Sequence, residues 1–377
     1  MNAAAGMGAG NLRAELLRRI EAGSHAEIAD ADFNTLALGV FRYQFQNNSP
    51  YRAFCERRDA TPRTVRQWSA IPAVPTSAFR AVPLVCGDPA DVEAVFRTSG
   101  TTVGPERRGE HYVPDLTLYH ASLRAGFAAH LLPDGARLPV LSLIPPPREL
   151  PDSSLSHMVN AVMTEFGAAG SAYFMGPAGI DHRDLIEALR SAERDNQPVC
   201  VLATSFALVH LLDALRERGE RFRLPAGSRL MDTGGFKGRS RHVSRNELYD
   251  LIGSELGIPP AWCVNEYGMT EMSSQFYDTE AGEPAGSVLA ERVHRRPGWV
   301  RTRAVDPETL ALLPDGETGI LRHWDLANLG SVAVLQTEDL GLYEEDGFRM
   351  LGRAEAAAPR GCSLATEELL SAIGRAS

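Results

Sequence analysis

Apolar side chains recur at helical spacing through the first part of this chain. Leucine, isoleucine and phenylalanine residues spaced three or four positions apart predict amphipathic helices over 12–21 and 31–51. A proline-rich connector at 71–75 then favours extended backbone, because proline disfavours helix in the residue before it. Residues 1–80 are therefore predicted to form a helical lead-in.

Short apolar runs alternate with helical patterns from residue 81 to residue 298. The runs are predicted to be strands, and they lie at 92–96, 138–144, 198–203, 229–232 and 262–265. The helical patterns end near residues 132, 165, 195, 218 and 256. Strands that alternate with helices predict an α/β core whose sheet is mainly parallel and covered by helices.

The pattern changes after residue 298. Turn-forming pairs at Asp306-Pro307, Asp315-Gly316 and Asp346-Gly347 separate short alternating segments, which predicts a small β-rich lobe of hairpins over 299–353. Residues 354–377 then form a C-terminal tail with one or two turns of helix at its end.

Composition narrows the class of protein. The 377 residues are 44% hydrophobic and 23% charged, as in globular proteins, and the net charge of −10 argues against nucleic acid as a partner. The five cysteines lack C-x-x-C spacing, so neither a disulfide framework nor a zinc site is indicated. We expect a cytoplasmic protein without a membrane span, because the first ten residues do not resemble a signal peptide and the most apolar stretch, 199–212, is short and partly polar.

A loop rich in glycine and hydroxyl residues follows the first predicted strand of the core. Ser99, Thr101 and Thr102 offer hydroxyl donors, and Gly100 and Gly104 allow backbone N–H groups to point into one concavity. This loop suits a polyanion such as a nucleotide triphosphate, although it lacks the Gly-Lys-Ser/Thr of the Walker pattern. A solvated turn is the equal alternative for the loop taken alone.

Two further strand ends, and one segment of the β-rich lobe, carry similar residues. Gly234 and Gly235 would let a planar ring approach the backbone, Tyr267 could stack on adenine, and Glu271 is an oxygen ligand that Mg²⁺ accepts beside phosphates. Asp339 could bind ribose hydroxyls. The alternatives are ordinary turns, a core tyrosine and a solvated carboxylate, but ligands of open α/β sheets bind beyond strand ends of this kind.

Taken in order, these motifs resemble those of the adenylate-forming acyl synthetases, from about residue 40 to the C-terminus. The segments 232–238, 265–271 and 360–364 more narrowly resemble the acyl-protein synthetase branch, the LuxE-type subunit of bacterial fatty acid reductase complexes, with phenylacetate–CoA ligases as distant relatives. The resemblance implies an α/β fold of the adenylate-forming type, with a large domain and a small β-rich lobe, lacking the full mobile C-terminal domain.

The resemblance also implies roles for individual residues. The phosphates of ATP would be bound by Ser99, Gly100, Thr101 and Thr102. The adenine would be lined by Gly234, Gly235 and Tyr267. The α-phosphate would be contacted by Thr270, Mg²⁺ by Glu271 and the ribose hydroxyls by Asp339, with Arg353 nearby.

This sequence departs from the wider family in two places. The usual Gly-x-Pro-Lys after the hydroxyl run is altered to Val103-Gly104-Pro105-Glu106-Arg107, so the loop has one extra residue and arginine replaces lysine. The chain also ends at Ser377, without the C-terminal domain that supplies a catalytic lysine in full-length ligases. The acyl-protein synthetase branch shares this shortness.

These parts imply a two-step reaction. A carboxylate attacks the α-phosphorus of ATP, pyrophosphate leaves, and an acyl-adenylate remains, a step in which fixed donors and Mg²⁺ neutralise the phosphates. Cys362 is our candidate nucleophile for the second step, in which its thiolate takes the acyl group as a thioester for a partner such as an acyl reductase. Arg353 and Arg360 are close in sequence and would lower the pKa of the thiol. The other four cysteines are expected to be buried.

Three further residues have open alternatives. Ser154 and His157 could line the acyl pocket or orient the substrate carboxylate, although a helix N-cap explains a serine in this segment equally well. Lys237 could reach a phosphate or the substrate carboxylate, or it could be a surface lysine. Two other functions also stay open, namely transfer of the acyl group to coenzyme A or another thiol, and a nucleotide-binding scaffold without catalysis.

Overall fold

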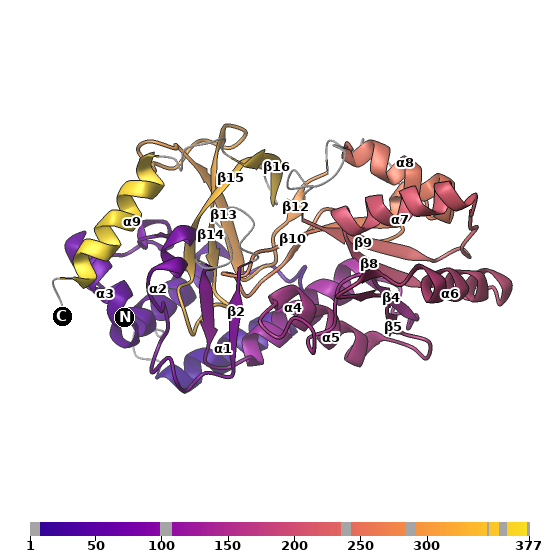
Figure 1. Ribbon diagram of the computed structural model, residues 1–377. Coiled ribbons are helices and arrows are strands. Elements are labelled where there is room, and N and C mark those ends of the chain that lie inside the picture. The colour runs from indigo at the N-terminus through magenta and orange to yellow at the C-terminus, as the bar shows by residue number, and fades with distance from the viewer. Residues whose placement is uncertain are drawn as a thin grey trace. The chain divides into compact units, whose positions relative to one another are not determined.

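The computed structural model describes residues 8–98, 108–234, 243–283, 292–344, 347–353 and 360–374, with the backbone alone described over 360–364 (Figure 1). The chain forms two compact units. The first comprises residues 1–126, 269–275 and 295–377, and the second comprises residues 127–268 and 276–294. The four-part division at residues 80, 298 and 353 stays a prediction.

Helices open the first unit. They are α1 (Ala9–Glu21), α2 (Asp30–Asn47) and α3 (Ser49–Arg57), followed by the 3₁₀ turns η2 (Trp68–Ala70) and η3 (Thr76–Arg80). The single helix predicted over 31–51 is wrong, because the chain breaks at Asn48. Asn48 adopts extended backbone and its side chain accepts a hydrogen bond from the Tyr51 amide at 3.1 Å, so it caps α3.

The β-rich part of the first unit is an antiparallel sheet in the order β13–β14–β15–β16. Its strands are β13 (Val300–Val305), β14 (Thr318–Asp325), β15 (Val334–Glu344) and β16 (Gly347–Arg353). The short strand β1 (Val74–Pro75) pairs with β15 in parallel, and a separate antiparallel hairpin joins β2 (Ala94–Arg97) to β3 (Glu110–Val113). The assignment of the strand at 92–96 to the parallel sheet is therefore wrong, because β2 pairs with β3 alone. The predicted β-rich lobe is therefore present.

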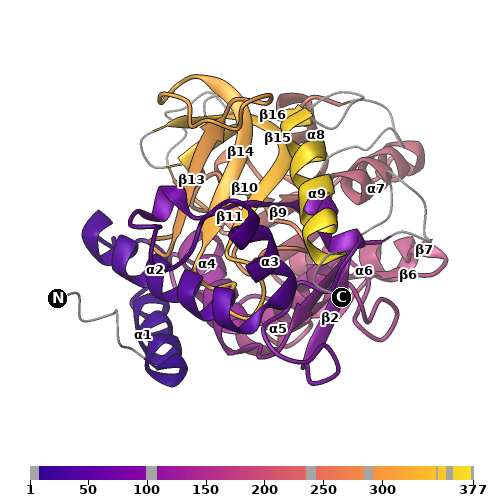
Figure 2. The same cartoon turned by 90° about the vertical axis from the view of Figure 1, so that its left-hand side faces the viewer.

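The last helix, α9 (Arg360–Ile373), is longer than the turn or two predicted. Its buried side chains Ala365, Leu369 and Ala372 recur at helical spacing, which explains why it continues over 14 residues. Figure 2 shows α9 beside α3, and a 2.6 Å ion pair joins Glu368 on α9 to Arg58, the residue after α3.

A parallel sheet forms the second unit, in the order β5–β4–β8–β9–β10, with β11 (Phe276–Tyr277) added antiparallel to β10. The parallel strands are β4 (Val140–Ser142), β5 (Ala172–Tyr173), β8 (Cys200–Thr204), β9 (Arg229–Thr233) and β10 (Cys263–Tyr267). The short strands β6 (Met175–Gly176), β7 (Gly179–Ile180) and β12 (His294–Arg295) were not predicted, nor were β5 and β11. At two residues each, they are too short to show a period.

Helices accompany this sheet. They are α5 (Ser154–Phe166), α6 (His182–Arg194), α7 (Ser205–Arg218) and α8 (Arg245–Leu256), and α4 (Thr117–Leu131) leads into the unit from the first. Figure 1 shows α7 and α8 together on one side of β8 and β9, and a continuous core of buried apolar side chains joins these elements. The predicted α/β class with a mainly parallel, helix-covered sheet is confirmed.

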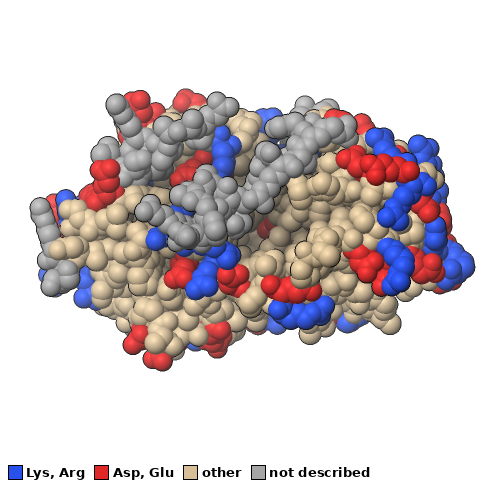
Figure 3. Space-filling view, viewed as in Figure 1, with Lys and Arg blue, Asp and Glu red and all other residues tan. Residues whose placement is uncertain are grey.

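Charged side chains of both signs are interspersed over α6 and α8 on the face shown in Figure 3. On α6, Arg183 pairs with Asp184 at 2.9 Å and Arg190 pairs with Glu220 at 2.5 Å. Within the described ranges, no helix is long and apolar enough to cross a membrane.

Candidate adenylation site

Gly234 directly follows β9 and has a φ of +74°, in the left-handed region that favours glycine. Its carbonyl accepts a hydrogen bond from Ser205 Oγ at 2.9 Å, so the first residue of α7 holds the turn. The neighbouring predicted site residues Gly235 and Lys237 lie outside the described residues.

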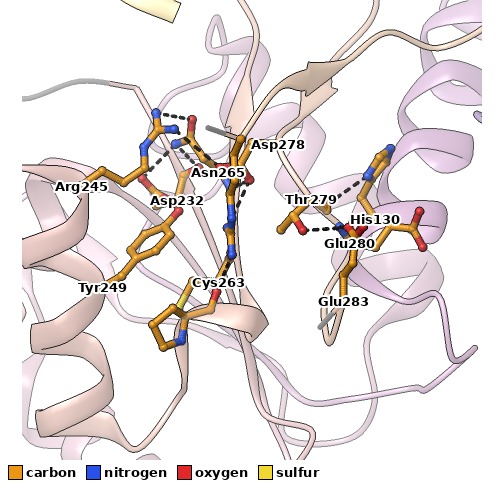
Figure 4. Close-up of polar contacts among 12 residues, drawn as sticks. His130, Asp232, Arg245, Tyr249, Cys263, Asn265, Asp278, Thr279, Glu280 and Glu283 are labelled. Carbon is orange, nitrogen blue, oxygen red and sulfur yellow. Dashed lines mark hydrogen bonds and ion pairs between the residues drawn. The ribbon is translucent and has the colours of Figure 1, made fainter. Parts of the chain in front are cut away.

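A buried carboxylate organises the ends of β9 and β10 (Figure 4). Asp232 Oδ1 accepts from the Tyr249 hydroxyl at 2.6 Å, and Asp232 Oδ2 accepts from Asn265 Nδ2 at 3.0 Å. Ser205 Oγ lies 2.9 Å from both Asp232 Oδ2 and the Gly234 carbonyl oxygen, which share its one hydroxyl proton. Arg245 in turn donates to Asn265 Oδ1 at 2.9 Å. This network ties the turn at Gly234 to both strands and to α8.

A second buried carboxylate, Asp278, joins the same network after β11. Its Oδ1 accepts from the backbone N–H of Asn265 at 2.8 Å, and the guanidinium groups of Arg245 and Arg292 lie 3.6 and 3.7 Å from its oxygens. Burial raises the pKa of Asp278 to about 6, while the two arginines oppose that shift. The two arginines stabilise the negative charge of Asp278, which would otherwise be costly in the protein interior.

Tyr267 is the last residue of β10 and is half-buried. Its ring centroid lies 5.8 Å from that of Phe276 and 5.9 Å from that of His294. Asn265 Nδ2 donates to Asp232, so Asn265 Oδ1 is an acceptor. His294 Nε2 therefore donates to Asn265 Oδ1, at 2.9 Å. The polar network therefore fixes one of the two rings beside Tyr267.

Ser154 and His157 lie in the first turn of α5, and both are half-buried. The helix is capped by Ser153, whose side chain accepts from the Ser156 amide at 3.2 Å, so capping accounts for Ser153 and not for Ser154. The substrate roles of Ser154 and His157 stay predictions.

In the first unit, the charged side chains around Glu271 come together. The Glu271 side chain is buried, with 8% exposure, and burial raises its pKa to about 7. The guanidinium groups of Arg80 and Arg353 act against that rise, and the carboxylate of Asp339 adds to it. The structure thus places three predicted residues, Glu271, Asp339 and Arg353, in one electrostatic cluster and adds Arg80 to it.

Asp339 and Arg353 face each other across the β15–β16 ladder. They are direct partners in the antiparallel register, and Arg353 Nε donates to Asp339 Oδ1 at 3.3 Å. The Asp339 side chain is 11% exposed and that of Arg353 is 56% exposed. The arginine therefore covers the carboxylate at the edge of the cluster.

Two side chains hold the backbone of Thr270 and Glu271. His111 Nδ1 donates to the Thr270 carbonyl at 2.7 Å, and Asn328 Nδ2 donates to the Glu271 carbonyl at 2.9 Å. Burial lowers the pKa of His111 to about 4, while the hydrogen bond to the Thr270 carbonyl and the contact of Nε2 with Asn328 Oδ1, at 3.0 Å, oppose that shift. These two hydrogen bonds fix the main chain that carries the Glu271 side chain.

Two hydrogen bonds join Thr98 and Gly109, which lie on either side of the hydroxyl-rich loop in the sequence. The Thr98 amide donates to the Gly109 carbonyl at 2.9 Å, and the Gly109 amide donates to Thr98 Oγ1 at 2.8 Å. The predicted phosphate-binding residues of the loop lie outside the described residues, and they are Ser99, Gly100, Thr101 and Thr102.

Cys362 lies in the first turn of α9, where the backbone alone is described. The other four cysteines are buried in the two units. Burial raises the pKa of the Cys55, Cys86 and Cys200 thiols to about 12 and that of Cys263 well above its ordinary value. These four side chains are protonated at neutral pH and lack the thiolate that a nucleophile needs.

The part of the chain that the structure describes has no group of three or more His, Cys, Asp or Glu residues arranged to hold a metal ion. Glu271 is a single buried carboxylate. Such a group fits Mg²⁺ only where phosphate oxygens and water complete the coordination, which is how Mg²⁺ is usually bound beside nucleotides.

The family model described as "Acyl-protein synthetase, LuxE" matches residues 24–371. The chain belongs to the LuxE family. Membership makes it a ligase of the acyl-protein synthetase class, and it confirms the resemblance read from the ordered motifs.

Two relatives of this LuxE-family chain are named long-chain-fatty-acid–luciferin-component ligase. The protein from Vibrio harveyi is 23% identical over 353 residues, which cover 89% of this chain and 88% of the relative. The protein from Aliivibrio fischeri is 21% identical over 355 residues, with the same coverage.

Solved structures similar to the LuxE-family chain are adenylate-forming ligases. 2-Hydroxyisobutyryl-CoA ligase in complex with 2-HIB-AMP superposes with a TM-score of 0.64 at 19% identity, over 87% of this chain and 69% of that one. ATP-bound MatB from Rhodopseudomonas palustris gives a TM-score of 0.50 at 18% identity, over 71% of this chain and 49% of that one. These likenesses show the fold, and the chain spans about half the length of MatB.

Several residues described in the two units of this LuxE-family chain had no role assigned from the sequence. They include Asp232, Asn265, His111, Asn328 and Arg80. A signal existed for the first two, because a carboxylate and an amide interrupt apolar strands, where burial requires hydrogen-bond partners. The other three meet Thr270 and Glu271 only through long-range packing, which no local pattern encodes.

Proposed function

We propose that this protein uses ATP to activate a fatty or other acyl acid as an acyl-adenylate and then transfers the acyl group to Cys362. The observation that carries the proposal is the cluster of Glu271, Asp339 and Arg353, in a chain that matches the acyl-protein synthetase family over residues 24–371. The printed names of the two relatives favour a long-chain fatty acid as the substrate.

In the first step, an oxygen of the substrate carboxylate attacks the α-phosphorus and the bond to the β-phosphate breaks. Thr270 would contact the α-phosphate, and Asp339 would accept hydrogen bonds from the ribose hydroxyls. Glu271 would hold Mg²⁺, which supplies charge neutralisation on the phosphates when bound. His111 and Asn328 support this step by fixing the main chain of Thr270 and Glu271.

Gly234, Gly235 and Tyr267 keep their proposed roles toward the adenine. The geometry that supports them is the hydrogen bond from Ser205 to the Gly234 carbonyl and the half-buried ring of Tyr267. Ser154 and His157 keep their proposed roles toward the acyl substrate, and Lys237 toward a phosphate or the carboxylate.

In the second step, the Cys362 thiolate attacks the acyl carbonyl, a thioester forms and AMP leaves. The burial of the other four cysteines supports this assignment, because their thiols do not ionise near neutral pH. An acyl reductase is the proposed acceptor of the acyl group, and the cytoplasm is the proposed compartment.

Carboxylate-dependent exchange between ATP and pyrophosphate tests the first step. We expect exchange with Mg²⁺ and at least one member of a panel of fatty, aromatic and short hydroxy acids, and its loss in Glu271→Ala. Exchange with no acid would support a scaffold without catalysis. Acylated coenzyme A that forms equally well in wild type and Cys362→Ser would support the alternative acceptor.

A further inference from the structure

Arg80 ends η3 and its guanidinium is exposed, although the turn beneath it is fixed. The preceding Phe79 is 2% exposed and packs edge-on against His111, with ring centroids 5.9 Å apart. His111 holds the Thr270 carbonyl. The backbone of Arg80 is therefore part of the same framework that positions Glu271.

The aliphatic part of the Arg80 side chain lies against Gly109, beside the β2–β3 hairpin. A Cβ atom on Gly109 would be 3.5 Å from Arg80 Cγ and 3.4 Å from Phe79 Cβ. Gly109 accepts a hydrogen bond from the Thr98 amide and donates one to Thr98 Oγ1. Arg80 Cγ and Phe79 Cβ therefore pack closely against Gly109, beside β3.

Arg80 differs from the other described arginines of this region in its partners. Arg353 donates to Asp339, Arg97 pairs with Glu110 at 2.9 Å, and Arg108 donates to the carbonyl of Arg97 at 3.1 Å. Within the described residues, Arg80 has neither a hydrogen-bond partner nor an ion pair. Its charge acts on the buried carboxylate of Glu271 and is available to a ligand.

We propose that Arg80 is a further phosphate-binding residue of the adenylation site, with its guanidinium on the β- and γ-phosphates of ATP. This inference rests on the proposed function. Glu271 would hold Mg²⁺, which would neutralise charge on the phosphates of ATP, and a cation beside Glu271 would meet the same phosphates. The planar guanidinium matches phosphate oxygens in a bidentate geometry.

In this position, Arg80 would take part in the first step of the reaction. When the substrate carboxylate attacks the α-phosphorus, the bond to the bridging oxygen breaks and its electron pair leaves with pyrophosphate. No proton is transferred in this step, and negative charge grows on the β-phosphate. Arg80 would stabilise that charge through its guanidinium.

The test is equilibrium binding of ATP, AMP and inorganic pyrophosphate, each with Mg²⁺, to the full-length wild type and three variants. Arg80→Ala should weaken ATP and pyrophosphate by about 10- to 100-fold, as for a lost charge-assisted contact, and change AMP by less than about threefold. Arg80→Lys should recover part of the loss. Arg63→Ala, an exposed arginine on the loop after α3, should bind all three ligands as wild type does.

Two results would overturn the proposal. One is unchanged binding of ATP and pyrophosphate by Arg80→Ala. The other is an equal loss for AMP, which would place Arg80 on the nucleoside or the α-phosphate. Thermal unfolding of each variant separates misfolding from lost contact, and Arg80→Lys provides the comparison if Arg80→Ala does not fold.

Failure of the adenylation reaction gives a different pattern. If wild type binds pyrophosphate through Arg80 but exchanges it into ATP with no acid, the proposed function fails and the phosphate site stands. If wild type exchanges pyrophosphate and Arg80→Ala binds it equally well, the function stands and the assignment of Arg80 fails. A wild type that binds none of the three ligands contradicts both.

Discussion

Burial raises the pKa of the Glu266 and Glu271 carboxyls to about 7. Their surroundings differ. Glu266 accepts a hydrogen bond from Thr233 Oγ1 within the second unit, whereas Glu271 is flanked by the guanidinium groups of Arg80 and Arg353 in the first. Among the described residues, Glu271 has two guanidinium groups near it but forms no ion pair, which leaves its carboxylate available to a bound Mg²⁺.

The pH dependence of stability tests the burial of Glu271. Because its pKa rises from 4.5 to about 7 on folding, its contribution to stability is complete below pH 4.5 and is lost as the pH rises through 7. Glu271→Gln removes this titration. The free energy of unfolding of the variant should therefore gain on wild type by roughly 3 kcal/mol between pH 4.5 and pH 8.

Urea unfolding of both proteins across this pH range measures the gain. Other titrating groups, including Glu266, are common to both proteins and cancel in the difference. A difference that stays constant with pH would show that Glu271 is exposed to solvent in the folded protein.

Sequence patterns predicted the residues of the cluster better than they predicted its support. Glycine, hydroxyl and acidic residues at strand ends directed attention to Glu271 and Asp339. Arg80 follows apolar residues in a short turn, and nothing local distinguishes it from a surface arginine. Its position follows from its own packing against Gly109 and from the packing of the preceding Phe79 against His111, both distant in sequence.

At the scale of elements, α9 is anchored to the start of the chain. Arg58 donates twice to Glu368, at 2.6 and 3.1 Å, Arg57 donates to Ser371 at 2.7 Å, and the Ser77 hydroxyl lies 2.8 Å from that of Thr366. On the apolar face of the helix, Leu369 is fully buried. The residue that we propose as the nucleophile thus lies in the first turn of a docked helix.

Charge reversal tests this docking. Glu368→Arg replaces an ion pair by two facing cations, and we expect docking of α9 to weaken by about 1 kcal/mol, since both side chains are about one-third exposed. Hydrogen exchange at the amides of residues 365–373 should then accelerate by about fivefold. The double variant Arg58→Glu with Glu368→Arg serves as the matched control, because it restores opposite charges. Equal exchange in the single and double variants would show that the ion pair does not hold the helix.

Helix and strand periods predicted most elements of both units, and the errors have identifiable causes. The helix predicted over 31–51 divides at Asn48, because apolar spacing continues through a residue whose side chain caps the next helix. Strands of two residues, such as β11 and β12, carry too few positions for an alternating pattern. Their pairing is decided by the longer strands beside them.

For the whole molecule, the proposed activity combines a family assignment with residues described in each unit separately. The first unit contains Glu271, Asp339, Arg353 and the helix of Cys362, and the second contains Gly234 and Tyr267. The chain passes from the second unit to the first between Gly268 and Met269, within the motif 267–271. One continuous motif therefore links the strand end at Tyr267 to the carboxylate of Glu271.

The intact mass of the protein after incubation with ATP, Mg²⁺ and a fatty acid tests the central proposal most directly. We predict an added mass equal to one acyl group, released by hydroxylamine, in wild type and in Cys200→Ala, a buried cysteine of β8. The adduct should be absent from Cys362→Ser, while that variant still exchanges pyrophosphate into ATP. An adduct that persists in Cys362→Ser, or a wild type that gains no mass while it exchanges pyrophosphate, would contradict self-acylation at Cys362.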